Sequence, residues 1–198
     1  MKTISDEFID KTWATMAACP QHTFLILTKR PGRMLSAVNA MVAKYGILPN
    51  VWLGCTIVNQ QEADEKIPRL LSVPGQKWLS IEPMLGPIDL KPFLGFWQWS
   101  RSENFQTWVP HEPSPIDAVV LGGETGPGAR PLHPDWVRSV RDQCAAAGVP
   151  FYFKQWGKIQ PAIKDLVGNE RPVPMDVIRG TWNRRIDGQE HNELAWKK

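Results

Sequence analysis

Five short apolar runs, each ending abruptly in polar or glycine-rich residues, constrain the fold of this chain most strongly. They span residues 23–28, 51–56, 77–81, 118–121 and 150–153. Runs this apolar suit strands buried on both faces, and the spacers of roughly 20 to 35 residues leave room for crossover helices, which predicts a parallel sheet. The predicted fold class is therefore α/β: an incomplete (β/α) barrel of about five parallel strands with flanking helices, an irregular Trp- and Pro-rich insertion and an irregular C-terminal tail.

Apolar residues at helical spacing fill the segments between the strands. The spacing predicts helices over 6–18, 31–45 and 134–147, and a shorter one over 63–71 that Pro68 interrupts. Caps suit the ends of these helices: Ser5 or Asp6 before the first, Pro31 in the first turn of the second, and Gly46 and Gly148 after the second and the last.

Length and composition favour a single domain with a tail. The 198 residues are 42% hydrophobic, enough for a substantial core, whereas a closed eight-stranded barrel needs about 250 residues. We expect residues 1–157 to form the partial barrel, with an insertion at 86–115 above the sheet that has the composition of a lid. Residues 158–198 should form a C-terminal extension that packs on the domain and frays at its end.

Charge and cysteine usage exclude several classes of site. A formal net charge of +3 is far from the basic stripe that marks nucleic-acid binding by electrostatics alone. Cys19, Cys55 and Cys144 are far apart in the sequence and form no CxxC pair or Cys/His cluster, so neither a zinc site nor a disulfide framework is predicted. There is no signal segment and no long apolar stretch, so we expect a cytoplasmic protein without a membrane partner.

The strongest local candidate for a site is the glycine-rich loop after the fourth run. Gly122 and Gly123 permit close approach of the backbone to a ligand, and a helix begins at Pro134. Backbone amides together with Arg130 suit an anion, and Glu124 suits an amine or a ribose hydroxyl. The alternative is that the glycines only shape a tight strand-to-helix connection.

Carboxylates and a lysine follow the neighbouring runs. Because the carboxyl ends of parallel strands share one rim, Glu82, Glu124 and Lys154 are candidates for acid–base catalysis there. The alternative is an ion-pair lattice that braces the rim. Thr56 and Asn59 are weaker candidates for cofactor binding, since small polar groups also satisfy loop backbones.

Several segments, among them LSIEPMLGPIDL, VVLGGETGPGARPLHPDWV and FYFKQWG, carry a family resemblance. They resemble, in collinear order over residues 6–157, a family of uncharacterised phage and prophage proteins related to radical S-adenosylmethionine enzymes. Proteins of that family begin with a three-cysteine segment and a second strand, and this chain begins after both. The resemblance implies S-adenosylmethionine as the cofactor, but no iron–sulfur cluster from this chain alone, because the three thiolates that hold one are missing.

The resemblance also implies roles for individual residues. It places Gly122, Gly123 and Glu124 toward the cofactor, with Glu82 and Lys154 as further positions, and it has an acidic residue where this chain has Asn59. The absence of two preceding strands would expose one edge of the strand at 23–28. We therefore expect either self-association or complementation by a separately encoded N-terminal half.

Three functions are compatible with these features. The first is the C-terminal part of a radical S-adenosylmethionine-like phage enzyme of unknown substrate, not competent alone. The second is a non-enzymatic phage binding protein that engages a host macromolecule, for example in counter-defence, through Trp97, Trp99 and Trp108 and a basic tail. The third is an enzyme for a phosphate-bearing ligand that uses the 122–130 loop.

Overall fold

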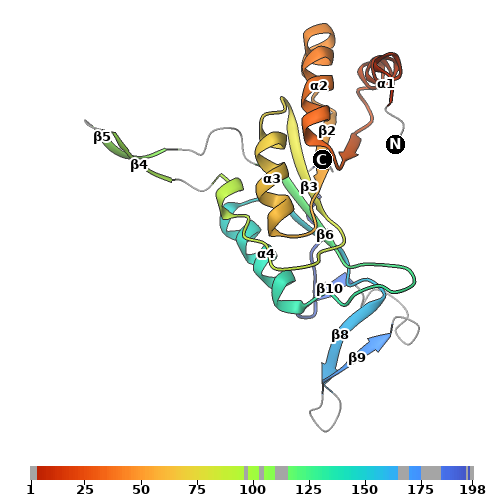
Figure 1. Cartoon of the computed structure of the whole chain (residues 1–198), viewed down its shortest axis with the longest axis vertical. Helices are drawn as coiled ribbons and strands as arrows, with labels where there is room; N and C mark the ends of the chain where they lie inside the picture. The colour runs from red at the N-terminus through yellow and green to blue at the C-terminus, as the bar shows by residue number, and fades with distance from the viewer. Residues whose placement is uncertain are drawn as a thin grey trace.

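The computed structural model describes residues 4–95, 98–102, 105–109, 116–164, 170–174, 184–194 and 196. Its centre is one five-stranded sheet with the strand order β1-β2-β3-β6-β7, in which every neighbouring pair is parallel (Figure 1). The strands are β1 (Phe24–Thr28), β2 (Val51–Thr56), β3 (Gln76–Ile81), β6 (Ala118–Gly122) and β7 (Phe151–Gln155). The α/β prediction of an incomplete barrel is confirmed: strands follow one another in chain order, and within the described residues the sheet does not close.

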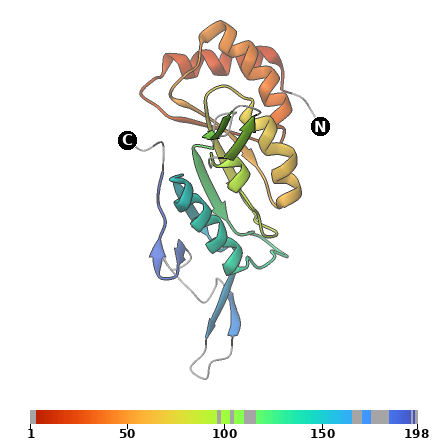
Figure 2. The ribbon, with the colours of Figure 1, turned by 90° about the vertical axis from the view of Figure 1, so that its left-hand side faces the viewer.

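Four helices accompany the sheet: α1 (Asp6–Ala18), α2 (Pro31–Tyr45), α3 (Gln60–Leu71) and α4 (Pro134–Ala147). Figure 2 shows α3 and α4 lying on the same side of the sheet. Their ends follow the capping rules, since the Ser5 hydroxyl accepts a hydrogen bond from the Phe8 amide and Gly148 adopts the left-handed conformation. Pro68 does not interrupt α3, contrary to expectation, and the helix continues to Leu71.

Strand residues alternate between two apolar clusters. Leu53, Leu79 and Phe153 point toward the helices and join the main core, together with helix residues such as Ile67 and Val140. The intervening positions form the other face of the sheet, where Trp52, Trp78 and Ala118 make a second, smaller cluster. The predicted burial on both faces is confirmed for β2, β3 and β6. It is wrong for the two edge strands, since Leu25 and Leu27 of β1 are 42% and 47% exposed and Lys154 of β7 is exposed as well.

Two strands extend further than their sequence patterns indicated. Strand β6 includes Gly122, and β7 runs through Lys154 to Gln155 instead of ending at Phe153. Trp136 of α4 is half-buried: it packs against the main core and lies beside His133 at a ring distance of 5.5 Å.

The insertion is more regular than its composition indicated. It contains a 3₁₀ turn, η1 (Lys91–Phe93), and an antiparallel hairpin of β4 (Gln98–Ser102) and β5 (Phe105–Val109). Its described flanks meet where the Ile116 amide donates to the Phe93 carbonyl oxygen at 3.4 Å, and the neighbouring Asp117 amide donates to Lys77 at the start of β3. The base of the insertion thus lies at the amino ends of the strands, opposite the position expected of a lid over the carboxyl rim. Trp97 lies outside the described residues.

The tail also contains regular structure where none was expected. It forms a hairpin of β8 (Ile159–Lys164) with β9 (Glu170–Pro174) and a short one of β10 (Arg185–Ile186) with β11 (Gln189–Glu190). Ile186 is fully buried in the main core, and Asp187 forms ion pairs with Arg138 and Arg141 of α4. Trp196 meets Trp52 and Trp78 edge to face in the smaller apolar cluster, at ring distances of 5.5 and 5.9 Å. The division into a domain and an extension stays a prediction.

The two sides of the sheet end differently. At β7, the Phe153 amide donates to the carbonyl oxygen of His191, so the tail covers part of that edge. At the other end β1 pairs only with β2 among the described strands, and Leu25 and Leu27 are 42% and 47% exposed. In the part of the chain that the structure describes, no helix is both long and apolar enough to cross a membrane.

Candidate functional site

The carboxyl ends of β3, β6 and β7 bring three of the sequence-predicted residues together. Glu82 follows β3 directly, and because Ile81 pairs with Leu121, it stands beside Gly122 at the end of β6. The pairing of β6 with β7 shifts at this point, from Leu121 opposite Phe153 to Gly122 opposite Gln155. Lys154 is the extra residue of this irregularity, which is the kind of position that re-aims a side chain.

Glu82 and Lys154 form an ion pair across the end of β6. The Lys154 ammonium donates to both carboxylate oxygens of Glu82, at 2.8 and 3.1 Å. The two side chains are 24% and 51% exposed, so the pair is open to a ligand. Gly122 leaves room for it, because a Cβ atom there would lie 3.2 Å from Glu82 Oε1.

Glu124 and Arg130 form a second pair within the glycine-rich loop. The guanidinium donates to both oxygens of the carboxylate at 2.8 Å, and the Arg130 amide adds a third bond at 2.9 Å. These bonds, the side-chain ones first, lower the pKa of Glu124 to about 2. Glu124 is therefore ionised at neutral pH and held by its own loop, so a ligand for either side chain must displace the other.

Gly123 serves a close contact between two loops. A Cβ atom there would stand 1.8 Å from the carbonyl oxygen of Trp156, and Gly157, at φ +92°, faces Glu124 in the same way. The Gly123 amide donates to the backbone carbonyl oxygen of Gln155 at 2.9 Å, and the Lys158 amide donates to the backbone carbonyl oxygen of Glu124 at 2.8 Å. This geometry favours the tight-connection alternative for Gly123, whereas Gly122 lies against the Glu82 carboxylate.

Thr56 and Asn59 lie at the end of β2. The Asn59 side chain caps α3 by accepting from the Glu62 amide at 2.9 Å, and Glu62 accepts in turn from the Val58 amide and pairs with Lys66. Thr56 is 4% exposed. The alternative that these residues satisfy local backbone therefore accounts for Asn59, and its role in cofactor binding stays a prediction along with that of Thr56.

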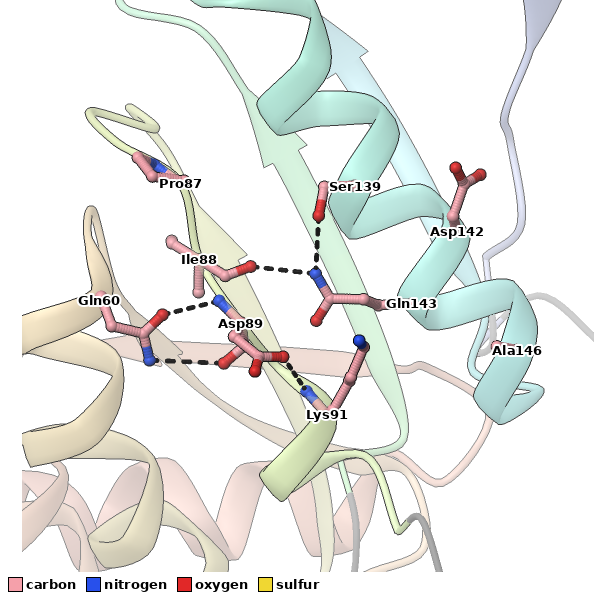
Figure 3. Close-up of a pocket in the computed structure, with 9 residues that line it drawn as sticks. All are labelled: Gln60, Pro87, Ile88, Asp89, Lys91, Ser139, Asp142, Gln143 and Ala146. Atoms are coloured by element: carbon pink, nitrogen blue, oxygen red, sulfur yellow. Dashed lines mark hydrogen bonds between the residues drawn. The ribbon is translucent and has the colours of Figure 1, made fainter.

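A cavity of about 690 Å³ lies elsewhere, on the helix side of the sheet between α3 and α4 (Figure 3). An extended strap, residues 87–91, crosses it and is held by two amide side chains. Gln143, only 7% exposed, accepts from the Leu90 amide at 2.6 Å and donates to the Ile88 carbonyl oxygen at 3.1 Å, while Gln60 bonds the backbone of Asp89 on both sides.

None of the residues predicted for the site lines this cavity. Gln143 was not singled out from the sequence, although a glutamine beside Cys144 on the apolar stripe of α4 is a usable signal for a buried polar anchor. The cavity lies along the connection from β3 to β6, because residues of the strap line it. The other connections between neighbouring strands contain helices instead of a strap.

Two of the cysteines, Cys55 and Cys144, are buried where the thiolate form is disfavoured. Burial raises the pKa of the Cys55 thiol to about 11 and that of Cys144 to about 12. Among the described residues, no three His, Cys, Asp or Glu side chains approach one another closely enough to hold a metal ion.

Comparison with known proteins gave one match. The model of a family described as "Protein of unknown function (DUF5131)" matches residues 1–195. Searches of curated proteins and of solved structures found no match.

Proposed function

The chain belongs to the DUF5131 family, and we propose that it supplies the ligand-binding rim of a radical S-adenosylmethionine-like enzyme of phage or prophage origin. The sequence resemblance supports the enzyme class and the origin. The observation that carries the binding role is the Glu82–Lys154 pair beside Gly122, at the carboxyl ends of three adjacent parallel strands. Ligands of open parallel sheets collect at this edge.

The pair suits the methionine part of S-adenosylmethionine. That part carries an ammonium and a carboxylate on one carbon, so it offers a partner to each member of the pair. Glu82 would hold the ammonium and Lys154 the carboxylate, as charge-assisted hydrogen bonds. Gly122 keeps the space beside Glu82 free of a side chain.

The iron–sulfur cluster would come from another polypeptide. When bound together with S-adenosylmethionine, a cluster supplies the electron that cleaves this cofactor. This chain's own contribution is to bind and orient the ligand. Glu124 is already paired with Arg130, which leaves recognition of the ligand's charges to Glu82 and Lys154.

The outer edge of β1, which pairs with no other strand among the described residues, is the proposed attachment point for that partner or for a second copy of the chain. An extended segment added there would meet the backbone groups of that edge and the exposed side chains of Leu25 and Leu27. We expect light scattering above micromolar concentration to show a dimer, or a stable complex with a separately encoded N-terminal half. A monodisperse monomer that also ignores such a half would contradict this part of the proposal.

Calorimetric titration with S-adenosylmethionine tests the rim. We expect binding that Glu82→Gln and Lys154→Gln each weaken at least ~10-fold, the loss that follows from removing one charged partner (about 1.5–3 kcal/mol). Glu65→Gln on the exposed face of α3 is the matched control and should change nothing. Binding that is unaffected by both rim substitutions, or no binding at all, would refute the binding role.

The hairpin supports a second candidate, a non-enzymatic binding protein that engages a host macromolecule. Trp99 and Trp108 are direct partners in the antiparallel register of β4 and β5. Capture of a host protein or nucleic acid that is lost when both are changed to alanine, in a protein that does not bind S-adenosylmethionine, would favour this function over the first.

A further inference from the structure

A second hollow lies between α1, α2 and the carboxyl end of β1, and its chemistry differs from that of the rim. This α1–β1 groove encloses about 490 Å³ and is lined mainly by apolar side chains of those three elements, among them Phe8, Leu27, Met34 and Ala37. Small-molecule sites have volumes of about 300–1,000 Å³ and a mostly apolar lining with few polar groups. In volume and lining, the groove falls within the range of small-molecule sites.

Apolar surface at its mouth faces solvent. Ile4 and Phe8 are each 60% exposed and Leu27 is 47% exposed, and all three line the groove. Large hydrophobic side chains gathered in this way mark a binding surface more often than singly scattered ones do.

The charged groups of the groove are all positive. Lys29, Arg30 and Arg33 line it, and among the described lining residues none carries a carboxylate. Asp6 pairs with Arg33 from outside the lining, so Lys29 supplies the positive charge that is offered to a ligand. The start of α2 adds the partial positive charge of its first turn, which no side chain caps.

A buried hydrogen-bond donor also lines the groove. Trp13 is 4% exposed, and its indole N–H has no hydrogen-bond partner among the residues that the structure describes. A buried donor without a partner costs free energy that an acceptor on a ligand would recover. Cations, helix amides and this indole together provide donors for an anion beside an apolar interior.

We propose that the α1–β1 groove binds a small amphiphilic anion, an apolar chain or ring that ends in a carboxylate. The apolar body would lie among Phe8, Leu27 and Met34, and the carboxylate near Lys29 and the first turn of α2. This inference does not depend on S-adenosylmethionine binding, since the groove shares no residue with the Glu82–Lys154 rim. It does share Leu27 with the edge of β1 proposed above as an attachment point, so a partner seated there would compete with the ligand.

Calorimetry with three eight-carbon probes tests the proposal on the full chain. Octanoate, octanol and octylammonium share one apolar body and differ in head-group charge. We expect octanoate to bind at least ~10-fold more tightly than octanol, in line with hydrogen bonds to charged groups, and octylammonium not to compete with it. Equal affinity for the three probes, or no binding of octanoate, would overturn the proposal.

Substitutions locate the binding in the groove. Ala37→Trp fills the space and should abolish octanoate binding, and Phe8→Ala, at an exposed position that the fold tolerates, should weaken it severalfold. Lys29→Glu should weaken it at least ~3-fold, whereas the same charge change at the remote, exposed Lys158 should not. Octanoate binding that survives both Ala37→Trp and Phe8→Ala would overturn the proposal. So would the finding that a second copy of the chain covers the groove and that octanoate does not.

Discussion

Replacing Gln143 by leucine tests how the connection from β3 to β6 is held without a helix. The side chain is 7% exposed and bonds three groups: the Leu90 amide, the Ile88 carbonyl oxygen and the Ser139 hydroxyl, at 2.6, 3.1 and 3.0 Å. Leucine has a similar volume, so the main loss is hydrogen bonding. The substitution leaves the Leu90 amide and the Ile88 carbonyl group buried without their hydrogen-bond partner.

The expected magnitude follows from these two backbone groups. An unsatisfied buried donor or acceptor costs about 1–3 kcal/mol, and water in the adjacent cavity can reach part of the strap, so we expect a total of about 2–4 kcal/mol. For a chain of this size, each kcal/mol shifts the Tm by about 2–4 °C, which predicts a decrease of about 5–15 °C.

Urea unfolding followed by far-ultraviolet circular dichroism measures the loss directly. Gln60→Leu is the matched control, because Gln60 is only half-buried and bonds the same strap at the exposed Asp89, so its loss should cost under about 1 kcal/mol. If the free energy of unfolding of Gln143→Leu lies within about 0.5 kcal/mol of that of the unmodified chain, which is the scatter of surface substitutions, burial of the glutamine does not secure the strap. The same conclusion follows if Gln143→Leu and Gln60→Leu lose equal stability.

Two further predictions concern the loops at the rim. Gly123→Ala should destabilise the protein by more than about 2 kcal/mol, because its Cβ would overlap the Trp156 carbonyl oxygen. Gly86→Ala is the control, since its Cβ meets open space and should leave the stability nearly unchanged. Thermal unfolding of the two variants measures the difference. Glu124 has a folded-state pKa of about 2, below its ordinary 4.5, so the stability it contributes is present above about pH 4.5 and is lost as the pH falls toward 2. Glu124→Gln should therefore flatten that part of the Tm-against-pH curve, and an unchanged curve would show that the Arg130 pair does not contribute.

Sequence periodicity sufficed for the sheet and the four helices, because each depends on local patterns of apolar residues and caps. The same reasoning located the Glu82–Lys154 contact only as one possibility, since the meeting of two strand ends depends on register, and the pairing shift at Gly122 has no local signature. It also missed the strap. Prolines and aromatic residues in the insertion indicated irregular structure, while the anchor lay on a helix more than fifty residues away, at Gln143.

A backbone hydrogen bond between Ile116 and Phe93 joins the two ends of the segment that carries the hairpin. Because this junction lies beside the start of β3, where the Asp117 amide bonds the Lys77 carbonyl oxygen, it sets the geometry that the sheet receives independently of the length of chain beyond it. The entropy of closing such a loop grows only slowly with length, so this junction tolerates exchange of the hairpin for a shorter or longer module. The protein can thus acquire a new recognition element there without rebuilding its core.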